Sequence, residues 1–378
     1  MSQLKLTDVA KINMGQSPSS ETYNSEKNGL PFYQGNVDFG EKYPTVRIWC
    51  DKPTKIAEPG DILMSVRAPI GALNYANEKC CIGRGLAAIT PDPDMTSSEF
   101  IYWFLRARHS ELNRIGTGST FKAINRKTLE SIEFPKYNKN EQYYIAEILS
   151  KIDKTIGEKK AQLEKLDNLI KARFVEMFGD FDLAPQCNEW IKLSKLGEIV
   201  SGSTPKTGTA EYWDGDICWI TPAELNSMSG IVYDSKKKIT EAGRNSCSLR
   251  LMPINTVILS SRAPIGKVAI LGKEMCCNQG FKNIICNEKI LPKYLYYLLA
   301  YNTDYLNSLG RGATFKEISK KIVEDIRISL PSIEQQAKFI TFSEQVDKSK
   351  FALSNELTMG NFYIRLIHDC IMHGSIDL

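Results

Sequence analysis

Two segments of this 378-residue chain combine glycines, hydroxyls and cations in a way suited to binding phosphate groups. GTGSTFKAINRK begins at Gly116 and GRGATFKEISKK begins at Gly310. Glycines let the backbone approach an anion closely, and lysine, arginine and hydroxyl groups bind phosphate oxygens. The side chains expected to make such contacts are Thr117, Ser119, Thr120, Lys122, Arg126, Lys127, Arg311, Thr314, Lys316, Lys320 and Lys321, together with Lys206. The alternative is that the glycines only form tight turns and that Phe121 and Phe315 fill a core.

Residues suited to catalysis or metal binding are not arranged in any recognisable site. The ten cysteines include no CxxC pair, and the three histidines form no HExxH motif. The adjacent pairs Cys80-Cys81 and Cys276-Cys277 are expected to point to opposite faces of a strand as small buried side chains. The closest approach to a nucleotide-binding loop, SRAPIGKV from Ser261, lacks its first glycine and its final hydroxyl. We therefore expect no catalysis, no bound metal and no bound cofactor.

The elements that position the two phosphate-binding segments occur twice in the chain. The pentapeptide RAPIG lies at 67–71 and again at 262–266, 195 positions later. At the same offset Cys81 matches Cys276 and Gly85 matches Gly280, and the TFK segments match at an offset of 194. A duplication of this length indicates two domains, each with its own core.

Each copy has the pattern of an α+β domain. Strand-like runs such as PFYQGNV, ILMSV, DICWITPAEL and TVILSS are bounded by glycine and proline. SSEFIYWFLRARHSEL and LPKYLYYLLAYNTDYL have apolar residues at helical spacing, and each is expected to form one packed helix. Their aromatic residues could stack on bases, but a place in the core is favoured. A last strand in each copy should end near Pro135 or Pro331.

Apolar residues follow a heptad pattern after each domain, which predicts two long helices. The first runs from Glu141 to about Phe178 and the second from Ile333 to about Met372, with an irregularity expected at Gly360. Because each seam must be covered, we expect the helices to pack antiparallel, with a pseudo-two-fold relation between the domains. The residues expected in this packing are Ile145, Leu149, Ile152, Ile156, Leu163, Leu166, Ile170, Leu353, Leu357, Ile364 and Ile367.

Composition and charge are those of an ordinary globular chain. The net charge is +4, from 48 basic and 44 acidic residues, which permits a nucleic-acid partner without requiring one. No apolar run is long enough to cross a bilayer, and the first residues lack the pattern of a signal peptide. We expect a cytoplasmic protein without membrane contact.

Each copy also begins with a GxxP turn, GQSP at 15–18 and GSTP at 202–205. Taken in order, the duplicated GxxP turns, RAPIG pentapeptides, TFK loops and long helices resemble the specificity subunit of type I restriction-modification enzymes over essentially the whole chain. The resemblance implies two target recognition domains, at 1–140 and 181–332, and two spacer helices, at 141–180 and 333–378. It also implies a split double-stranded DNA target, two methyltransferase subunits and restriction subunits as partners. S-adenosylmethionine, ATP and Mg²⁺ would then be bound only by those partners. The second copy lacks the Pro-Gly-Asp turn that precedes the first RAPIG strand.

Base contacts are expected at positions where the two copies differ. Arg84 and Gln279 align with each other, and arginine suits guanine whereas glutamine suits adenine in the major groove. The arginines of the RAPIG turns could either touch DNA or brace their own turns. The candidate side chains are Gln34, Asn36, Asp38, Arg67, Arg84, Glu224, Asn226, Arg262 and Gln279.

Three other readings compete with this one. A coiled-coil scaffold that binds proteins or glycans would ignore DNA sequence and vary little with salt, whereas phosphate binding weakens steeply as salt rises. A decoy specificity chain would occupy a methyltransferase without reading DNA. A pair of RNA-binding domains is disfavoured because no RNP-like KGFGF string is present.

Overall fold

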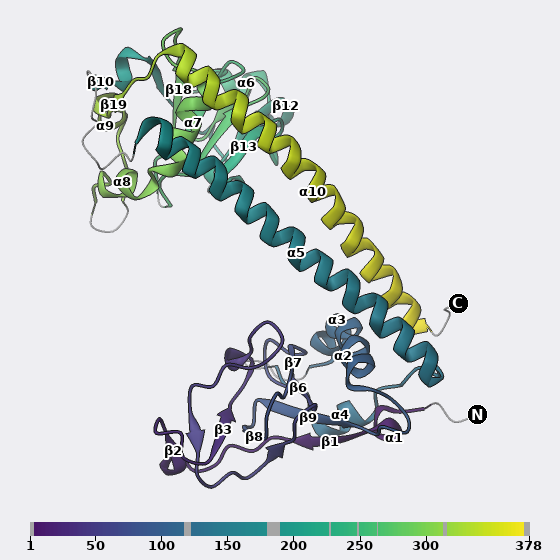
Figure 1. Ribbon diagram of the computed structural model, residues 1–378. Helices are drawn as coiled ribbons and strands as arrows, with labels where there is room; N and C mark the ends of the chain where they lie inside the picture. Colours follow the sequence, from purple (N-terminus) through teal and green to yellow (C-terminus); the bar gives the residue numbers. More distant parts are fainter. Residues whose placement is uncertain are drawn as a thin grey trace. The chain divides into compact units, whose positions relative to one another are not determined.

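The computed structural model of the chain describes residues 4–116, 122–179, 190–226, 228–247, 249–262, 264–312 and 316–373, without the side chains of residues 228, 229, 372 and 373. The chain divides into two compact units (Figure 1). The first unit contains Met1–Ala161 and Leu353–Leu378, and the second contains Gln162–Ala352. Each unit is an α+β domain with one part of each long helix, as the sequence predicts.

The first unit is built on a four-stranded antiparallel sheet with the order β1-β9-β6-β7. A second sheet, ordered β2-β4-β3-β8-β5, is mixed because β3 and β8 run parallel. Helix α2 covers the first sheet with buried aromatic and aliphatic residues, which confirms the expected core role of this helix. The elements are α1 Leu6–Val9, β1 Ala10–Met14, η1 Ser20–Thr22, β2 Tyr23–Asn24, β3 Leu30–Tyr33, η2 Asn36–Asp38, β4 Trp49–Cys50, β5 Ile56–Ala57, β6 Ile62–Ser65, β7 Leu73–Tyr75, β8 Cys80–Ile82, β9 Leu86–Pro91, α2 Ser98–Ala107, α3 His109–Ile115 and α4 Arg126–Glu130.

The second unit repeats this plan. Its sheet β11-β18-β15-β16 is antiparallel like that of the first unit and gains β13, which runs parallel to β16. The parallel pair β12 and β17 corresponds to β3 and β8. The elements are β10 Trp190–Lys192, η3 Leu193–Lys195, β11 Gly197–Ser201, η4 Ala210–Tyr212, β12 Trp213–Ile220, η5 Pro222–Glu224, β13 Met228–Val232, β14 Lys237–Ile239, α6 Glu241–Asn245, β15 Val257–Ser260, β16 Val268–Leu271, β17 Cys276–Cys277, β18 Phe281–Cys286, α7 Pro292–Tyr301, α8 Thr303–Ser308, α9 Lys320–Asp325 and β19 Arg327–Ser329.

The aromatic segment of each copy forms two helices and not the single helix expected. The break falls at Arg108 between α2 and α3, and at Asn302 between α7 and α8. The guanidinium of Arg108 is bound to Glu111, at 2.7 Å, and to the carbonyl of Glu133, at 2.9 Å. The bond to Glu133 joins residues 25 positions apart, and apolar periodicity gives no information on such a contact.

The paired cysteines lie on strands, as predicted, and face different cores. Cys80 belongs to a cluster with Tyr33 and Ile82, whereas Cys81 packs with Phe32 and Cys50. Burial raises the pKa of the Cys80 thiol to about 12 and does the same for Cys276. Both thiols therefore stay protonated and unreactive near neutral pH.

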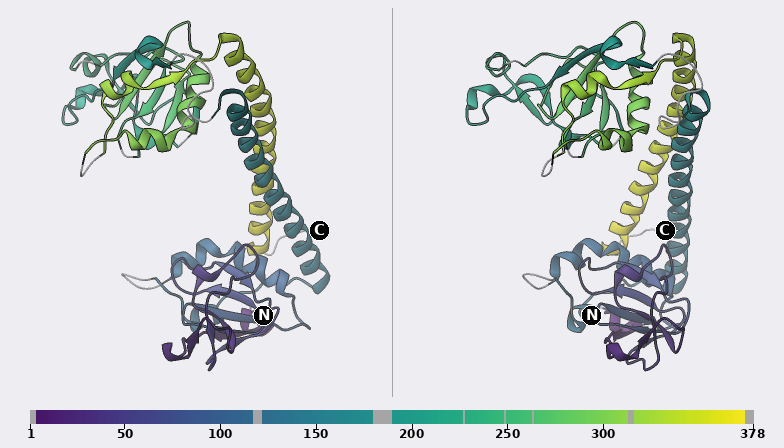
Figure 2. Two further views of the ribbon diagram at one scale, coloured as in Figure 1. Left: turned by 60° about the vertical axis from the view of Figure 1, so that its left-hand side comes forward. Right: turned by 90° about the vertical axis from the view of Figure 1, so that its left-hand side faces the viewer.

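Two long helices, α5 (Lys139–Phe178) and α10 (Ile333–His373), lie side by side (Figures 1 and 2). In the first unit the Tyr137 hydroxyl donates to the carbonyl of Cys370, at 3.2 Å, and Ile156 packs on Gly360. In the second unit Phe174 and Phe339 are 5.2 Å apart. Early residues of α5 thus meet late residues of α10, and the helices are antiparallel, as predicted.

The predicted seam points inward along both helices. Ile145, Leu149, Ile156, Ile170 and Ile364 are buried. The remaining predicted seam residues, Ile152, Leu163, Leu166, Leu353, Leu357 and Ile367, are partly buried. An irregularity was expected at Gly360, but α10 continues through this residue. A β-carbon there would lie 3.0 Å from Cγ1 of Ile156, so glycine allows the two helices to approach closely.

Each long helix is fastened to its own domain by a buried glutamine. Gln142 donates to the carbonyls of Met95, at 3.1 Å, and Tyr137, at 2.9 Å. Gln336 donates to the carbonyls of Lys289, at 3.2 Å, and Pro331, at 2.9 Å. The two glutamines are 194 positions apart, like the TFK segments, so the attachment is part of the repeat.

Candidate nucleic-acid interface

Three loops of the first unit meet beside the ends of its strands. They are residues 15–18, which follow β1, residues 34–38, which follow β3, and residues 83–85, which connect β8 and β9. The amide of Gly83 donates to the carbonyl of Tyr33, at 2.8 Å, and the amide of Arg84 donates to Oγ of Ser17, at 3.3 Å. A β-carbon at Gly85 would lie 2.3 Å from the carbonyl oxygen of Gln34, so this contact requires glycine. We call these loops the first loop cluster.

The second unit builds the same arrangement from residues 202–205, 221–226 and 278–280, the second loop cluster. The amide of Ser203 donates to the carbonyl of Cys277, and that of Asn278 donates to the carbonyl of Ile220, both at 2.9 Å. The Thr204 hydroxyl donates to the amide oxygen of Gln279. The clusters therefore bring together, within each unit, segments that are distant in the sequence.

A carboxylate holds the middle loop of each cluster. Asp38 is 6 % exposed and accepts from the amide of Gln34, at 2.7 Å, and from Nε of Arg47, at 3.0 Å. Glu224 accepts from the amides of Thr221, at 2.9 Å, and Lys236, at 2.6 Å. The sequence suggested base contacts for both carboxylates. In the structure their oxygens are bound within the protein, where they close a short turn as capping groups.

A second anchor on the same loops differs between the units. In the first unit the side chain of buried Asn74 exchanges hydrogen bonds with the backbone of Gly40, at 3.1 and 3.0 Å. In the second unit the ammonium of Lys267 donates to the carbonyls of Pro222, at 3.1 Å, and Leu225, at 2.6 Å. The loops are thus held before any ligand binds, which lowers the entropy cost of binding.

Polar side chains remain exposed around the loops. In the first cluster Gln34 and Arg84 are exposed and Asn36 is half-buried. In the second cluster Asn226 is exposed and Gln279 is half-buried, with its amide oxygen also accepting from Asn278, at 3.0 Å. The structure thus places Gln34, Asn36, Arg84, Asn226 and Gln279 in the loop clusters, and their contact with bases stays a prediction.

Several further cationic residues lie beside the clusters and were not among the predicted contacts. Arg47 reaches the first cluster through Asp38, and the carbonyl of Lys55 accepts from the amide of Ile82, at 2.9 Å. Lys236 joins the second cluster through Glu224, and Lys237 lies 5.6 Å from the ring centre of Trp213. The tertiary fold brings these residues to the loops, and only the run of three lysines from Lys236 to Lys238 could have indicated a basic patch.

The RAPIG turns adjoin the loop clusters. The amides of Val66 and Ser261 donate to the carbonyls of Gly85, at 2.9 Å, and Gly280, at 2.7 Å. Arg67 and Arg262 follow these residues, and both are exposed. Arg262 forms an ion pair with Glu317, Nε to Oε2, at 3.1 Å.

The two TFK segments, which the sequence predicts to bind phosphate, are described only in part. Thr117, Ser119, Thr120, Phe121, Thr314 and Phe315 lie outside the described residues. Lys122 and Lys316 are exposed, and the carbonyl of Lys122 accepts from the amide of Ala68, at 3.2 Å, so this lysine lies beside the first RAPIG turn. Arg311 is also exposed, and its backbone pairs with Glu317. Lys206 is exposed close to the second cluster, where its carbonyl accepts from Trp213.

Four other predicted cations lie elsewhere in their units. Arg126 lines a hollow with Ala10 and Pro91, which pair at one end of β1 and β9. Gly85 and the first loop cluster lie at the other end of this strand pair. It is paired with Glu130 within α4, where Lys127 is exposed. Lys320 and Lys321 pair with acidic residues of their own helix α9, which packs on η3 and β11. The structure does not bring these four cations to the loop clusters.

The chemistry of the clusters is that of hydrogen bonding and charge. Within the described residues, no group of three or more histidine, cysteine, aspartate or glutamate side chains could hold a metal ion. The helices of the described part of the chain include none that is long and apolar enough to span a membrane.

Comparisons with known proteins agree with this architecture. The profile of the family described as "Type I restriction modification DNA specificity domain" matches residues 1–168 and 186–359. The MjaIX specificity subunit of Methanocaldococcus jannaschii is 39 % identical over 184 residues, which are 47 % of this chain and 43 % of that protein. The EcoDI specificity subunit of Escherichia coli is 20 % identical and covers 91 % of this chain and 80 % of its own length.

Solved structures show the same fold. The S subunit of a type I restriction-modification system from M. genitalium aligns with a TM-score of 0.61 and 17 % identity, covering 98 % of this chain and 95 % of that one. A chain from a structure that concerns complex assembly of the type I system aligns with a TM-score of 0.65 and 16 % identity, covering 99 % and 98 %. The duplicated domains, the paired helices and the two matches of the family profile lead to one conclusion: the chain belongs to the family of type I restriction-modification DNA specificity proteins.

Proposed function

We propose that this chain is the non-catalytic DNA-recognition subunit of a type I restriction-modification complex. Each domain reads one half of a split target in double-stranded DNA, and the helix pair carries two methyltransferase subunits. The observation that carries the proposal is the pair of loop clusters. Both have the same backbone frame, and both display exposed amide and cationic side chains that differ between the copies.

The side chains of the clusters suit the edges of bases in the major groove. Arg84 in the first cluster can donate two hydrogen bonds to guanine. The amide oxygen of Gln279 in the second cluster already accepts from Thr204 and Asn278, so this side chain can donate from its amide nitrogen to a base acceptor such as N7 of adenine. Neighbouring cations such as Lys55 and Lys236 can bind phosphates and hold the loops in register. Two clusters with different side chains on one backbone frame are what a protein needs to read two different half-sites.

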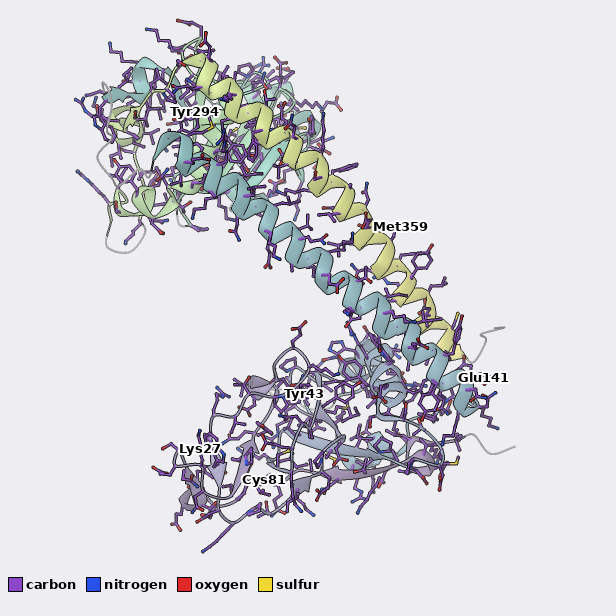
Figure 3. All side chains as sticks on the ribbon, viewed as in Figure 1. Lys27, Tyr43, Cys81, Glu141, Tyr294 and Met359 are labelled. Atoms are coloured by element: carbon purple, nitrogen blue, oxygen red, sulfur yellow. The ribbon has the colours of Figure 1, made fainter. Side chains whose placement is uncertain are left out.

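The outer face of α10 supports the second part of the proposal. We define this face by Met359, Phe362, Tyr363 and Leu366, which are 46–60 % exposed. Met359 is labelled in Figure 3. An apolar patch of this kind on a helix is typical of a surface that binds another protein. One structural relative comes from a structure that concerns complex assembly of the type I system, and a methyltransferase subunit of such a complex is the partner we assign to this face.

The first experiment maps DNA methylation. The chain is co-expressed with a type I methyltransferase partner in a host free of DNA methylation, and modified adenines are located by long-read sequencing. We expect one motif of two short half-sites separated by a fixed gap. A stable complex that methylates no motif would favour a decoy specificity chain, and the absence of a complex would favour an unrelated scaffold.

The docking face is tested separately. The double variant Phe362→Ser, Leu366→Ser should lose co-purification with the methyltransferase while its thermal unfolding temperature stays within about 2 °C of the parent, because both residues are already exposed. Lys154→Ala is the matched control, since Lys154 is exposed on α5 and its ion pair with Glu158 is weak, at 3.9 Å. Full retention of the partner by the double variant would contradict the assignment of this face.

A further inference from the structure

Three charged residues of the second unit form a group at the RAPIG turn. Glu317 binds Nε of Arg262, at 3.1 Å, and also faces Nζ of Lys282, at 3.5 Å. Lys282 is 5 % exposed and lies beneath the turn, where it also reaches Oγ of Ser261, at 3.2 Å. Arg262 remains 52 % exposed at its side chain. The group therefore runs from the interior to the surface and ends in a guanidinium.

The charges of the group fix the position of Glu317 and leave an excess of positive charge. Two cations share one carboxylate, so the group carries about one positive charge in total. Burial lowers the pKa of Lys282, and the carboxylate of Glu317 opposes this shift. Removing Glu317 alone would leave a buried ammonium without its partner, which is costly. Glu317 is thus held from below while it binds Arg262 above.

The bond to Nε determines which atoms of Arg262 remain available. Within the described part of the chain, Nη1 and Nη2 of Arg262 make no hydrogen bond. An arginine bound through Nε presents these two nitrogens side by side, as a bidentate contact to the O6 and N7 atoms of guanine requires. Arg262 directly follows Ser261, whose amide donates to the carbonyl of Gly280 in the second loop cluster, at 2.7 Å.

The first unit has the same backbone without the charged pair. Arg67 pairs with Ala123 through the backbone, as Arg262 pairs with Glu317. Alanines at 87 and 123 occupy the positions that correspond to Lys282 and Glu317, at offsets of 195 and 194. The frame therefore does not need the two charges, and their role is specific to the second unit.

We propose that Glu317 and Lys282 are positioning residues that hold Arg262 to read a guanine in the half-site of the second domain. Arg67, which has no carboxylate paired with it among the described residues, contacts a backbone phosphate. This inference rests on the proposed DNA-recognition function and adds a specificity-determining residue to it.

The test uses the whole complex and maps its methylated motif. The double variant Lys282→Ala, Glu317→Ala recreates the alanine pair of the first unit and should fold. We expect it to relax the motif at one guanine of one half-site, with discrimination there reduced roughly tenfold to a hundredfold. The other half-site should stay unchanged. Arg262→Lys keeps the charge but not the two-nitrogen edge, and it should relax the same position.

Arg67→Ala is the matched variant in the first domain. It should leave the motif intact and reduce the dependence of log K on log salt concentration by about one. If Arg262→Lys and the double variant both keep the full motif, or weaken all sequences equally, the inference is wrong although the proposed function stands. If the parent complex itself yields no split motif, it is the proposed function that fails.

Discussion

The two recognition domains both pack on the helix pair through apolar side chains, but the further contacts beside this packing differ. In the first unit, Nε1 of Trp103 donates to the hydroxyl of Ser150, at 3.0 Å, and Arg106 binds Asp153, at 2.8 Å. The ring of His368 from α10 lies 6.1 Å from that of Trp103. We call these side chains the polar seat; they lie beside the apolar packing of α2 on Ile145 and Leu149 and include a titratable group.

The seat of the second domain is aromatic. Phe174 and Phe178 from α5, Phe339 from α10, and Tyr294 and Tyr297 from α7 lie in contact, with ring centres 5.0–5.8 Å apart. Tyr294 is labelled in Figure 3. Offset and edge-to-face pairs of this kind add to the stabilisation from burial. Both copies therefore rest on the helix pair through apolar packing, to which the first copy adds hydrogen bonds, an ion pair and a histidine, and the second adds a set of aromatic contacts. The two copies should respond differently to perturbation because these added contacts differ.

The largest expected effect comes from a charge in the helix seam of the first unit. Ile156 is 6 % exposed and packs on Gly360, so Ile156→Asp buries a carboxylate without a partner. We expect a loss of about 3–5 kcal/mol in the free energy of unfolding and loss of the complex with the methyltransferase. Light scattering and thermal unfolding measure the two effects. Lys160→Asp is the control, because it introduces the same side chain at an exposed position of α5; it should cause neither the loss of stability nor the loss of the complex. A complex of unchanged size with Ile156→Asp would contradict the role of the seam.

Variants of the two capping carboxylates, Asp38 and Glu224, allow a direct comparison of the two loop clusters. Asp38→Asn should cost about 1–3 kcal/mol of stability, because the neutral amide no longer offers Arg47 a charged acceptor. Glu224→Gln should cost less, because Glu224 is only half-buried. Urea unfolding gives the energies, and methylation mapping should show weaker recognition of one half-site for each variant. Glu41→Gln, at an exposed position, is the control. Equal effects of all three variants would rule out a bracing role.

The polar seat predicts a pH dependence that is confined to the first unit. Burial and the charge of Arg106 lower the pKa of His368 from its usual 6.5 to about 4, while Asp369 and Asp153 act in the opposite direction. The unfolded chain therefore binds more protons than the folded one between these values, and stability falls as pH drops from 6.5 towards 4. We expect a loss of about 1–2 kcal/mol over this window.

His368→Phe should remove this dependence, whereas His109→Gln, which changes an exposed histidine of the same unit, should retain it. Thermal unfolding followed from pH 7 to pH 4 measures the effect. The aromatic seat of the second domain contains no histidine among its contacting residues, so the transition of that unit should not share the dependence. A pH response that survives in His368→Phe would contradict the assignment.

Much of the fold could be predicted from the sequence because the duplication is visible as identical residues at a fixed spacing. Identical residues at offsets of 195 and 194 indicated two domains, and the heptad pattern of Ile145, Leu149 and Ile156 indicated the helix pair. The break at Arg108 and the role of Gly360 could not be predicted, because both depend on side chains that come close only in the folded chain. Apolar spacing records which face is buried but not what lies against it.

The loop clusters could be predicted only in part. Arg84 and Gln279 were predicted because they align at an offset of 195 but differ in side chain, and the structure places both in the loop clusters. Asp38 and Glu224 were assigned to bases, although each lies near the end of a short turn where a carboxylate caps backbone amides. Arg47 and Lys236 were not predicted beside the clusters because they come from other segments and contact the clusters through those carboxylates.

The smallest expected effect distinguishes phosphate contacts from base contacts in the two copies. Lys122 and Lys316 are equivalent and exposed, so Lys122→Ala and Lys316→Ala should each weaken binding to all sequences equally and lower the salt slope by about one. Binding titrations at several salt concentrations, on matched and mismatched duplexes, measure both quantities. Lys136→Ala, remote from the TFK segments in sequence, is the control. Because a phosphate carries no sequence information, loss of discrimination at one base pair in either variant would move that lysine from the backbone to a base edge.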